Sequence, residues 1–310
     1  MFMKVALWIV RALDWASDLV FRIVLIMALA FGVYSLWDAQ QVFDEAEAVH
    51  YTAYRPSAED ELNFEQLRQI NPEVFAWLTV NGTPIDYPVV QAKNNEKYLN
   101  TNAKGNFSMS GALFLDYRND PRFEDFNSVV YGHHMEKKQM FGCLSDYAEQ
   151  EYLDEHAYGN LFFDGKDHGL EFFALILTNG YDRELYANKI EEETKRTAYL
   201  DSVKSKAITH RDVELSTEDH LVVLSTCTTR ITNGRYLLVG KLTEELYLQE
   251  KEEKPVLLIR GDGTDAIRMG ALTSLPVWLW CGVLAAMLLG LHAISKKGKQ
   301  KVSKEGANEA

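Results

Sequence analysis

A cysteine, two histidines and an arginine stand at the ends of short apolar runs in this sequence. Cys227 ends one run of aliphatic and β-branched residues, and Arg235 begins the next after a loop of seven residues. Two runs joined by such a loop predict antiparallel neighbours, so Cys227 and Arg235 should meet at one end of a sheet. A third run, Ser128–Gly132, leads into His133 and His134. A thiol, an imidazole and a guanidinium that converge can perform cysteine acyl transfer, because the thiol attacks, the imidazole moves protons and the guanidinium holds the oxyanion.

Two cysteines compete for the role of nucleophile. A buried cysteine is usually just a small apolar side chain, and Cys143 has a setting typical of one. Cys227 ends a predicted strand and is followed by a loop with basic residues, which makes it the better candidate. The third cysteine, Cys281, lies in an apolar C-terminal segment, and no C-x-x-C or Cys/His metal spacing occurs. We therefore expect no metal and no cofactor.

The histidine and arginine positions also offer alternatives. His133 and His134 are adjacent, so in an extended chain they point to opposite faces and at most one can serve the site. Position alone does not decide between them. Arg235 begins the strand next to that of Cys227, whereas Arg230 lies inside the loop and is free to be solvated. We favour Arg235 for the oxyanion, because a guanidinium keeps its proton and presents several donors in a fixed plane.

The elements that must position these residues are mostly strands. Short apolar segments bounded by turn residues predict strands at 75–80, 85–90, 112–117, 128–132, 170–178, 220–226 and 236–242. Helices are predicted over 57–71, 141–155 and 190–206. The pattern indicates a mostly antiparallel barrel with peripheral helices.

Charge is distributed unevenly along the 310 residues, of which 47% are hydrophobic. Between residues 38 and 270, Asp and Glu outnumber Lys and Arg by 41 to 24, whereas both ends are slightly basic. This acidic body argues against nucleic acid as a partner, because phosphate binding needs clustered Lys and Arg.

Two apolar segments predict membrane spans near the two ends. Residues 19–37 are apolar apart from Arg22, and residues 271–294 contain no Asp, Glu, Lys or Arg; both segments are long enough to cross a bilayer. Basic residues precede the first span and five lysines follow the second. The positive-inside rule then puts both termini in the cytoplasm and the acidic body outside the cell membrane. A cleavable signal peptide is the alternative for the first segment, but its apolar run continues to Trp37, further than such a signal extends.

These features divide the chain into seven segments. They are a cytoplasmic segment 1–18, a transmembrane anchor 19–37, an extracellular stalk 38–59, a catalytic domain 60–250, a linker 251–270, a second transmembrane helix 271–294 and a basic cytoplasmic tail 295–310. All the residues considered for chemistry fall in the catalytic domain.

The chain resembles a sortase, and specifically a class B sortase, in several linked motifs. The block Leu224–Cys227, followed by Arg235, resembles the sortase signature. The block Tyr131–Met135 is similar to the class B histidine motif, in which the histidine directly after the glycine is catalytic, and this similarity favours His133. Further matches are 85–91, 95–99 and 113–118. The resemblance extends over residues 60–245.

This resemblance implies a mostly β fold, an eight-stranded sortase barrel with peripheral helices, including a long helix between the sixth and seventh strands, here Ile190–Lys206. The two spans predicted from hydropathy flank this barrel. It implies a transpeptidase at the surface of a Gram-positive bacterium. Cys227 would attack the backbone carbonyl of a threonine in the C-terminal sorting signal of a secreted protein, and an amine would resolve the thioacyl enzyme. His133 would act as acid and base, and Arg235 with nearby backbone amides would stabilise the oxyanion. The substrate groove would be bordered by the segment before the seventh strand and by Asn95, Leu99, Ser225 and Thr226.

The second span departs from the class B pattern, because most class B sortases carry only the N-terminal anchor. A C-terminal span is more typical of the pilus-polymerising class C enzymes, but the stalk has no Asp-Pro-aromatic lid, and Asp120-Pro121 lies inside the core. Attachment of surface proteins to the cell wall, with a peptidoglycan precursor amine as acceptor, is the first expectation. Pilin polymerisation, with a lysine side chain as acceptor, is a close second. The expected partners are therefore sorting-signal proteins, one of these amines and the lipid bilayer.

Two other classes of function compete with this one. A cysteine hydrolase of the papain or amidase kind also uses Cys and His, but its cysteine begins a helix upstream of the histidine. Here His133 precedes Cys227, and Cys227 ends a predicted strand. A membrane-tethered adhesion or scaffold domain would make the three residues coincidental. Loss of peptide cleavage on alkylation of one thiol would exclude that alternative.

Overall fold

The computed structural model describes residues 2–56 and 62–247. The described chain forms two units, one ending at Ala39 and the other beginning at Gln40. The linker, the second transmembrane helix and the basic tail predicted for 251–310 lie outside the described residues.

The first helix, α1, runs without interruption from Phe2 to Glu45. It contains residues 2–18 of the predicted cytoplasmic segment, the predicted first span and the beginning of the predicted stalk. Its segment Val5–Glu45 is 41 residues long and has a mean hydropathy of 2.3 in its most apolar part. Among the described residues it is the one helix long and apolar enough to cross a membrane, which suggests an N-terminal anchor.

The chain after α1, predicted as stalk, packs against the folded body. Two short 3-10 helices follow, η1 (Ala48–His50) and η2 (Thr52–Tyr54). Ala46 and Tyr51 are buried, and the Ala46 carbonyl accepts a hydrogen bond of 2.9 Å from the Tyr87 hydroxyl. The folded body therefore includes part of the sequence predicted as stalk.

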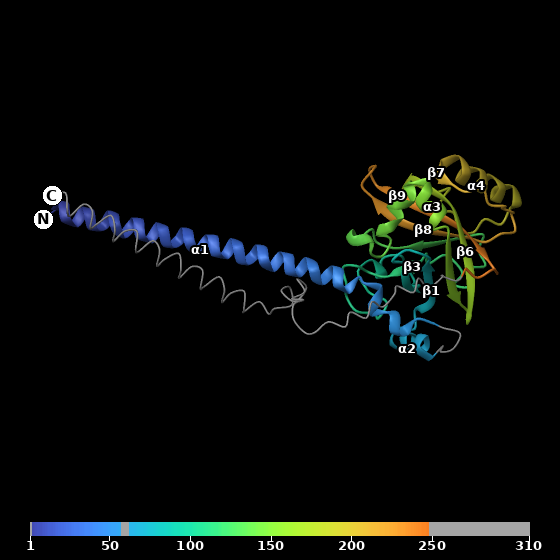
Figure 1. The fold of residues 1–310 in the computed structure, drawn as a ribbon, viewed down its shortest axis with the longest axis horizontal. Helices are drawn as coiled ribbons and strands as arrows, with labels where there is room; N and C mark the ends of the chain where they lie inside the picture. Colours follow the sequence, from blue (N-terminus) through green and yellow to red (C-terminus); the bar gives the residue numbers. More distant parts are fainter. Residues whose placement is uncertain (1, 57–61, 248–310) are drawn as a thin grey trace, which may run out of the picture. The chain divides into compact units, whose positions relative to one another are not determined.

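Eight of the nine strands in the described chain close into a barrel (Figure 1). The barrel order is β5-β1-β2-β3-β4-β8-β9-β6, the pairing of β5 with β6 closes the ring, and β7 adds to β6 as a ninth strand. The strand bounds are β1 Val74–Val80, β2 Asp86–Val90, β3 Leu113–Leu115, β4 Asn127–Tyr131, β5 Tyr158–Phe163, β6 Lys166–Asn179, β7 Ala207–His210, β8 Leu221–Thr228 and β9 Gly234–Thr243. The eight-stranded barrel that the resemblance implied is confirmed.

Most neighbouring strands of the barrel are antiparallel, as the sequence predicted, with two exceptions. The pairs β2–β3 and β4–β8 are parallel. Parallel neighbours need a long connection, and the chain between β4 and β8 contains three strands, β5, β6 and β7, and two α-helices, α3 and α4.

Three elements differ from the sequence-based predictions. Strands β5 and β7 were not predicted, because β7 is short and β5 contains Gly159 and Asn160, which are uncommon in strands. Pairing with β1 on one side and β6 on the other nevertheless keeps β5 extended. The helix predicted over 141–155 is a 3-10 helix, η5 (Gly142–Ala148), followed by α3 (Gln150–Glu155), because Glu149 between them is extended.

Both faces of β8 are buried, which explains its unbroken apolar run. Val222 and Leu224 belong to the main core, whereas Leu221 and Val223 belong to a second core. Successive side chains of a strand point to opposite faces, so the main core fills the barrel and the second core lies on its outer face.

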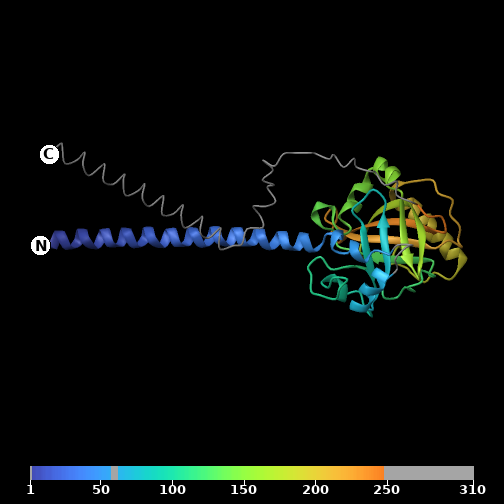
Figure 2. The ribbon, with the colours of Figure 1, turned by 60° about the horizontal axis from the view of Figure 1, so that its bottom comes forward.

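Helices cover two separate parts of the barrel. Helix α4 (Glu193–Lys206) supplies Tyr199, Leu200 and Val203 to the second core. Helix α2 (Leu62–Ile70) buries Phe64 and Leu67 in the main core. Figures 1 and 2 show α2 and α4 on different sides of the barrel, well apart in both views.

Candidate active site

Strands β4, β8 and β9 bring His133, Cys227 and Arg235 to one end of the barrel. β4 and β8 are parallel, with Tyr131 opposite Ser225, so His133 and Cys227, each two residues further on, follow neighbouring positions of the two strands. The antiparallel pairing of β8 with β9 places Cys227 directly opposite Arg235. The predicted meeting of Cys227 and Arg235 is confirmed.

The side chains of Cys227 and Arg235 also share one face of the sheet. Val223 of β8 and Leu237 of β9 point outward into the second core. Because side chains alternate along a strand, Cys227 and Arg235, which lie an even number of positions from these two residues, belong to the same outer face. The site therefore lies on the outside of the barrel, and Cys227 is exposed there.

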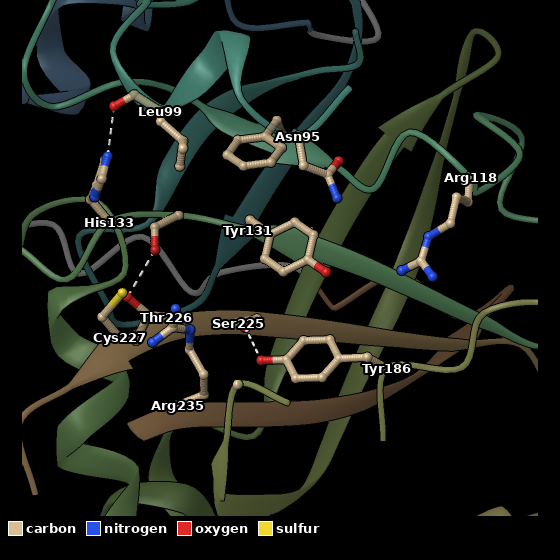
Figure 3. Close-up of a pocket in the computed structure, with 13 residues that line it drawn as sticks. Asn95, Leu99, Arg118, Tyr131, His133, Tyr186, Ser225, Thr226, Cys227 and Arg235 are labelled. Atoms are coloured by element: carbon tan, nitrogen blue, oxygen red, sulfur yellow. Dashed lines mark hydrogen bonds between the residues drawn. The ribbon is translucent and has the colours of Figure 1, made fainter. Parts of the chain in front are cut away.

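A cavity of about 360 Å³ opens around these residues. Figure 3 draws the thirteen residues that line it and labels ten of them. The lining residues are Asn95, Leu99, Phe114, Arg118, Tyr131, Gly132, His133, Gly180, Tyr186, Ser225, Thr226, Cys227 and Arg235. All seven residues predicted for catalysis or substrate binding are among them.

The two described cysteines have opposite surroundings. Cys227 is exposed and lines the cavity. Cys143 has no exposed surface, and burial raises the pKa of its thiol to about 12. A thiol must lose its proton to become a nucleophile, so the environment of Cys143 suits packing alone, as the sequence predicted.

The imidazole of His133 lies between the Leu99 carbonyl and the Cys227 thiol (Figure 3). Its Nε2 is 2.7 Å from the Leu99 oxygen. A carbonyl oxygen only accepts hydrogen bonds, so Nε2 must carry a proton and Nδ1 is left to exchange protons in the cavity. His134 instead forms an isolated β-bridge with Met140 and does not line the cavity. The geometry thus distinguishes the two histidines where sequence position could not.

Arg235 and Arg230 are also separated by the structure. Arg235 is partly buried, lines the cavity and donates a hydrogen bond of 2.9 Å from Nη1 to the Gly234 carbonyl. Within residues 2–56 and 62–247 its other N–H groups have no hydrogen-bond partner, so they can meet an oxyanion beside Cys227. Arg230 is exposed in the loop and is not part of the cavity wall.

The four predicted groove residues reach the cavity in different ways. Leu99 is 45% exposed, so its side chain offers apolar surface to a ligand. Ser225 and Thr226 are buried: the Thr226 hydroxyl donates to the Gly132 carbonyl at 2.8 Å, and the Ser225 hydroxyl pairs with that of Tyr186 at 2.9 Å. These two hydroxyls therefore fix the ends of β4 and β8 and the position of Tyr186.

Six lining residues were not among the predicted site residues. Phe114, Arg118, Tyr131, Gly132 and Gly180 lie in or beside strands, and Tyr186 lies in a loop. Tyr131 could have been found, because it stands two positions before His133 and so shares its face of the strand. Its ring is parallel to that of Tyr186, with centroids 6.2 Å apart. Tyr186 carries no comparable signal, since a loop has no fixed periodicity.

The loop that carries Tyr186 is tied to the fold through Asp182. The Asp182 carboxylate accepts hydrogen bonds of 3.0 Å from Thr178 and from Lys206 of α4. Burial alone would raise the pKa of Asp182, but these partners outweigh burial and lower it. Tyr186 is therefore held at the cavity from two elements, β6 and α4.

The cavity holds a nucleophile, a proton carrier and a fixed cation without metal ligands. Among residues 2–56 and 62–247, no group of three or more His, Cys, Asp or Glu side chains could hold a metal ion. The chemistry that the arrangement offers is thus attack of a thiol on a polarised carbonyl, with proton transfer through an imidazole.

Comparison with known proteins identifies the family. No protein-family model matches the chain. Sortase B of Listeria monocytogenes is 33% identical over 210 residues, which cover 66% of this chain and 84% of that protein. Sortase B from the type II pilus of Streptococcus pneumoniae is 44% identical, with a TM-score of 0.52, over 59% of this chain and 99% of that one. A Streptococcus pyogenes class B sortase involved in pilus biogenesis is 36% identical, with a TM-score of 0.54, over 58% and 98% of the two chains.

The barrel is that of the sortases, and these relatives imply a cysteine transpeptidase. Within this class, the chain belongs to the class B sortase family.

Proposed function

We propose that this chain is a membrane-anchored cysteine transpeptidase that cleaves a C-terminal sorting signal after threonine and transfers the acyl group to an amine. One observation carries the proposal: Cys227, His133 and Arg235 line a single open cavity, with Cys227 opposite Arg235 and His133 at the end of the neighbouring parallel strand. Class B membership supports the same chemistry.

In the first half of the reaction, the Cys227 proton passes to Nδ1 of His133 and the thiolate attacks the threonine carbonyl carbon. The carbonyl oxygen gains negative charge, which Arg235 stabilises by hydrogen bonding. The C–N bond then breaks, the imidazolium gives its proton to the leaving amine, and the acyl group remains on sulfur as a thioester.

In the second half, the acceptor amine attacks the thioester carbon and loses a proton to His133. The C–S bond breaks, Cys227 leaves as thiolate, and a new amide is formed. One amide bond is exchanged for another, so the reaction needs no oxidant, metal or cofactor. The Leu99 carbonyl keeps the imidazole in place in both halves because it bonds Nε2 and leaves Nδ1 for the moving proton.

The acceptor is either a peptidoglycan precursor amine, which would attach surface proteins to the cell wall, or a pilin lysine. Sequence motifs alone favoured wall attachment. The two compared sortases described with pili are 44% and 36% identical to this chain, against 33% for the Listeria protein. We therefore propose pilin polymerisation and wall attachment with equal weight, and the acceptor experiment below distinguishes them.

The proposed location is the cell membrane, with the barrel outside and both termini in the cytoplasm. The helix Val5–Glu45 supports the N-terminal anchor by its length and composition. The second span, 271–294, rests on hydropathy and on the lysines that follow it.

The test uses the purified full-length chain in detergent with quenched peptides that carry Asn-Pro-x-Thr or Leu-Pro-x-Thr signals. Oligoglycine, diaminopimelate-type and pilin-lysine acceptors are added separately. We expect a thioacyl adduct on Cys227 by mass spectrometry and a ligated product with one preferred acceptor. The product from the lysine acceptor indicates pilus assembly, and the product from the diaminopimelate acceptor indicates wall attachment.

The adjacent histidines provide a matched control for this experiment. His133→Gln should abolish the adduct, whereas His134→Gln should leave it within about twofold of the wild type, because His134 is outside the cavity. No adduct from any peptide with a folded wild-type chain would refute the proposal.

A further inference from the structure

A buried carboxylate stands behind the wall of the cavity. Asp116 follows β3 and has no exposed surface. Its two oxygens accept five hydrogen bonds: from the Arg118 Nε and Nη2 atoms at 2.8 Å each, and from the Arg118 backbone amide, Asn95 Nδ2 and the Tyr131 hydroxyl at 3.0 Å each. A buried charge is tolerated only when it is paired and hydrogen-bonded in this way.

The three side chains that Asp116 holds all line the cavity. Asn95, Arg118 and Tyr131 come from separate parts of the chain, and their shared contact is the Asp116 carboxylate. The Asn95 amide is fixed at its other end as well, because its oxygen accepts a hydrogen bond of 3.0 Å from the Tyr117 amide. Asp116 therefore sets the orientation of one polar wall.

This polar wall lies away from the nucleophile. Figure 3 shows Arg118 and Cys227 at opposite ends of the cavity, with Tyr131 between them. Arg118 is therefore placed to contact a bound ligand rather than the atoms that react at Cys227.

The guanidinium of Arg118 has one free edge. Nε and Nη2 are engaged by Asp116, whereas Nη1 donates no hydrogen bond within the described part of the chain, and the side chain is 45% exposed. The ion pair cancels the charge of the guanidinium, so the free edge suits an uncharged acceptor such as a peptide carbonyl or amide oxygen better than an anion.

We propose that Asp116 is a positioning residue for peptide recognition: it orients Arg118 so that the free Nη1 edge donates to an uncharged oxygen of the bound acyl-donor peptide. The proposal rests on the proposed function, since it assumes a peptide in this cavity. The peptide then spans the cavity from its threonine carbonyl at Cys227 to the oxygen at Arg118.

The test measures binding separately from chemistry. Fluorescence anisotropy records the affinity of labelled sorting-signal peptides for the full-length Cys227→Ala chain in detergent, which binds without reacting. In this background, Asp116→Asn and Arg118→Gln should each weaken peptide binding about tenfold, the size expected for loss of one well-formed hydrogen bond. The double variant should be no weaker than Arg118→Gln alone, because Asp116 acts through Arg118.

Two controls separate positioning from a structural role. Asp125→Asn removes another carboxylate that accepts bonds from Asn119 and the Asp120 amide in a neighbouring loop, outside the cavity, and should leave affinity unchanged. In the chain that keeps Cys227, the rate of its alkylation by iodoacetamide should change less than twofold in Asp116→Asn.

Unchanged affinity in Arg118→Gln, or additive losses in the double variant, overturns the inference. If Asp116→Asn does not fold, Arg118→Gln decides alone. A third outcome separates the two proposals: the peptides bind, Asp116→Asn weakens that binding, and no adduct forms on the wild-type chain. This outcome supports the inference about Asp116 and refutes the proposed transpeptidation. If no peptide binds, both fail.

Discussion

At the scale of single residues, exposure and proton affinity separate the two described thiols. Cys227 faces the cavity, while Cys143 is enclosed by apolar neighbours that raise its pKa to about 12. Limited iodoacetamide treatment of the native chain at pH 7.5 should therefore modify Cys227 and spare Cys143, because only an accessible thiolate reacts. Peptide mapping by mass spectrometry measures both sites. Equal modification of the two in a chain that stays folded would contradict this.

The two arginines of the β8–β9 region form a second matched pair. Arg235→Lys should reduce kcat at least about 100-fold, because one ammonium cannot replace the planar set of donors at the oxyanion. Arg230→Lys should stay within about twofold of the wild type, since Arg230 is exposed outside the cavity. Initial rates of cleavage of a quenched peptide measure both variants. Equal effects of the two changes would overturn the assignment of Arg235 to the oxyanion.

Residue-level prediction from sequence succeeded where strand geometry carries the information. Cys227 and Arg235 could be paired because a hairpin fixes its own register. His133 could be chosen over His134 only through family resemblance, since the hydrogen bond to Leu99 depends on a distant loop. Asp116 could not be found at all, because its partners meet only when the barrel closes.

At the scale of elements, the loop between β2 and β3 supports the imidazole. Gly111 in this loop has φ +60°, and a Cβ there would lie 2.4 Å from the Tyr98 oxygen and 3.2 Å from the His133 ring. Gly111→Ala should therefore push the loop and His133 apart and lower kcat by at least about tenfold. The rate with saturating quenched peptide measures this.

Gly105 is the matched control in the same loop. It has φ +84°, yet a Cβ there would meet nothing within 4 Å. Gly105→Ala carries similar backbone strain, of order 1 kcal/mol, without touching the site. Both variants should have a lower free energy of unfolding, but only Gly111→Ala should also have a lower kcat. An equal loss of kcat in the two variants would show that backbone strain alone is responsible.

Element prediction was best where an apolar run had clear turn residues at both ends. Strands β8 and β9 were predicted within a few residues of their bounds. β5 was missed because Gly159 and Asn160, which are uncommon in strands, stand inside it, and only pairing with β1 and β6 keeps it extended. The break at Glu149 between η5 and α3 has no sequence signal that we recognise.

At the scale of the whole molecule, buried carboxylates link stability to pH. Burial pushes the pKa of Asp116 upward, but hydrogen bonds from Arg118 and Asn95 outweigh it and bring the pKa below 3.8. When the pKa of a carboxyl group is lower in the folded chain than in the unfolded chain, its ionisation stabilises the fold. This stabilisation is fully present at a pH above the unfolded-state pKa and is lost as the pH falls through the folded-state pKa. The difference in thermal unfolding midpoint between the wild type and Asp116→Asn should therefore have its full size at pH 6 and become smaller below about pH 4. Near-UV circular dichroism measures both midpoints, and a difference that does not change with pH would contradict the lowered pKa of Asp116.

The two predicted spans make a prediction about the intact chain. Deletion of residues 1–37 or of residues 271–310 alone should leave the protein in the membrane fraction, because one span of about 20 apolar residues is a sufficient anchor. Deletion of both should release it. Fractionation with carbonate washing and immunoblotting measures each form; release by the N-terminal deletion alone would show that 271–294 does not span the membrane.

The parallel pairing of β4 with β8 also determines when the chain becomes reactive. Cys227 meets Arg235 through a short hairpin, but the strand leading to His133 joins that of Cys227 only across 94 positions of sequence, as between Gly132 and Thr226. Local contacts of a hairpin form sooner than contacts of such long separation. A chain that has formed only its β8–β9 hairpin thus carries the thiol and the guanidinium without the imidazole beside them. Under the proposed mechanism, such a chain should not cleave sorting signals before its barrel has closed.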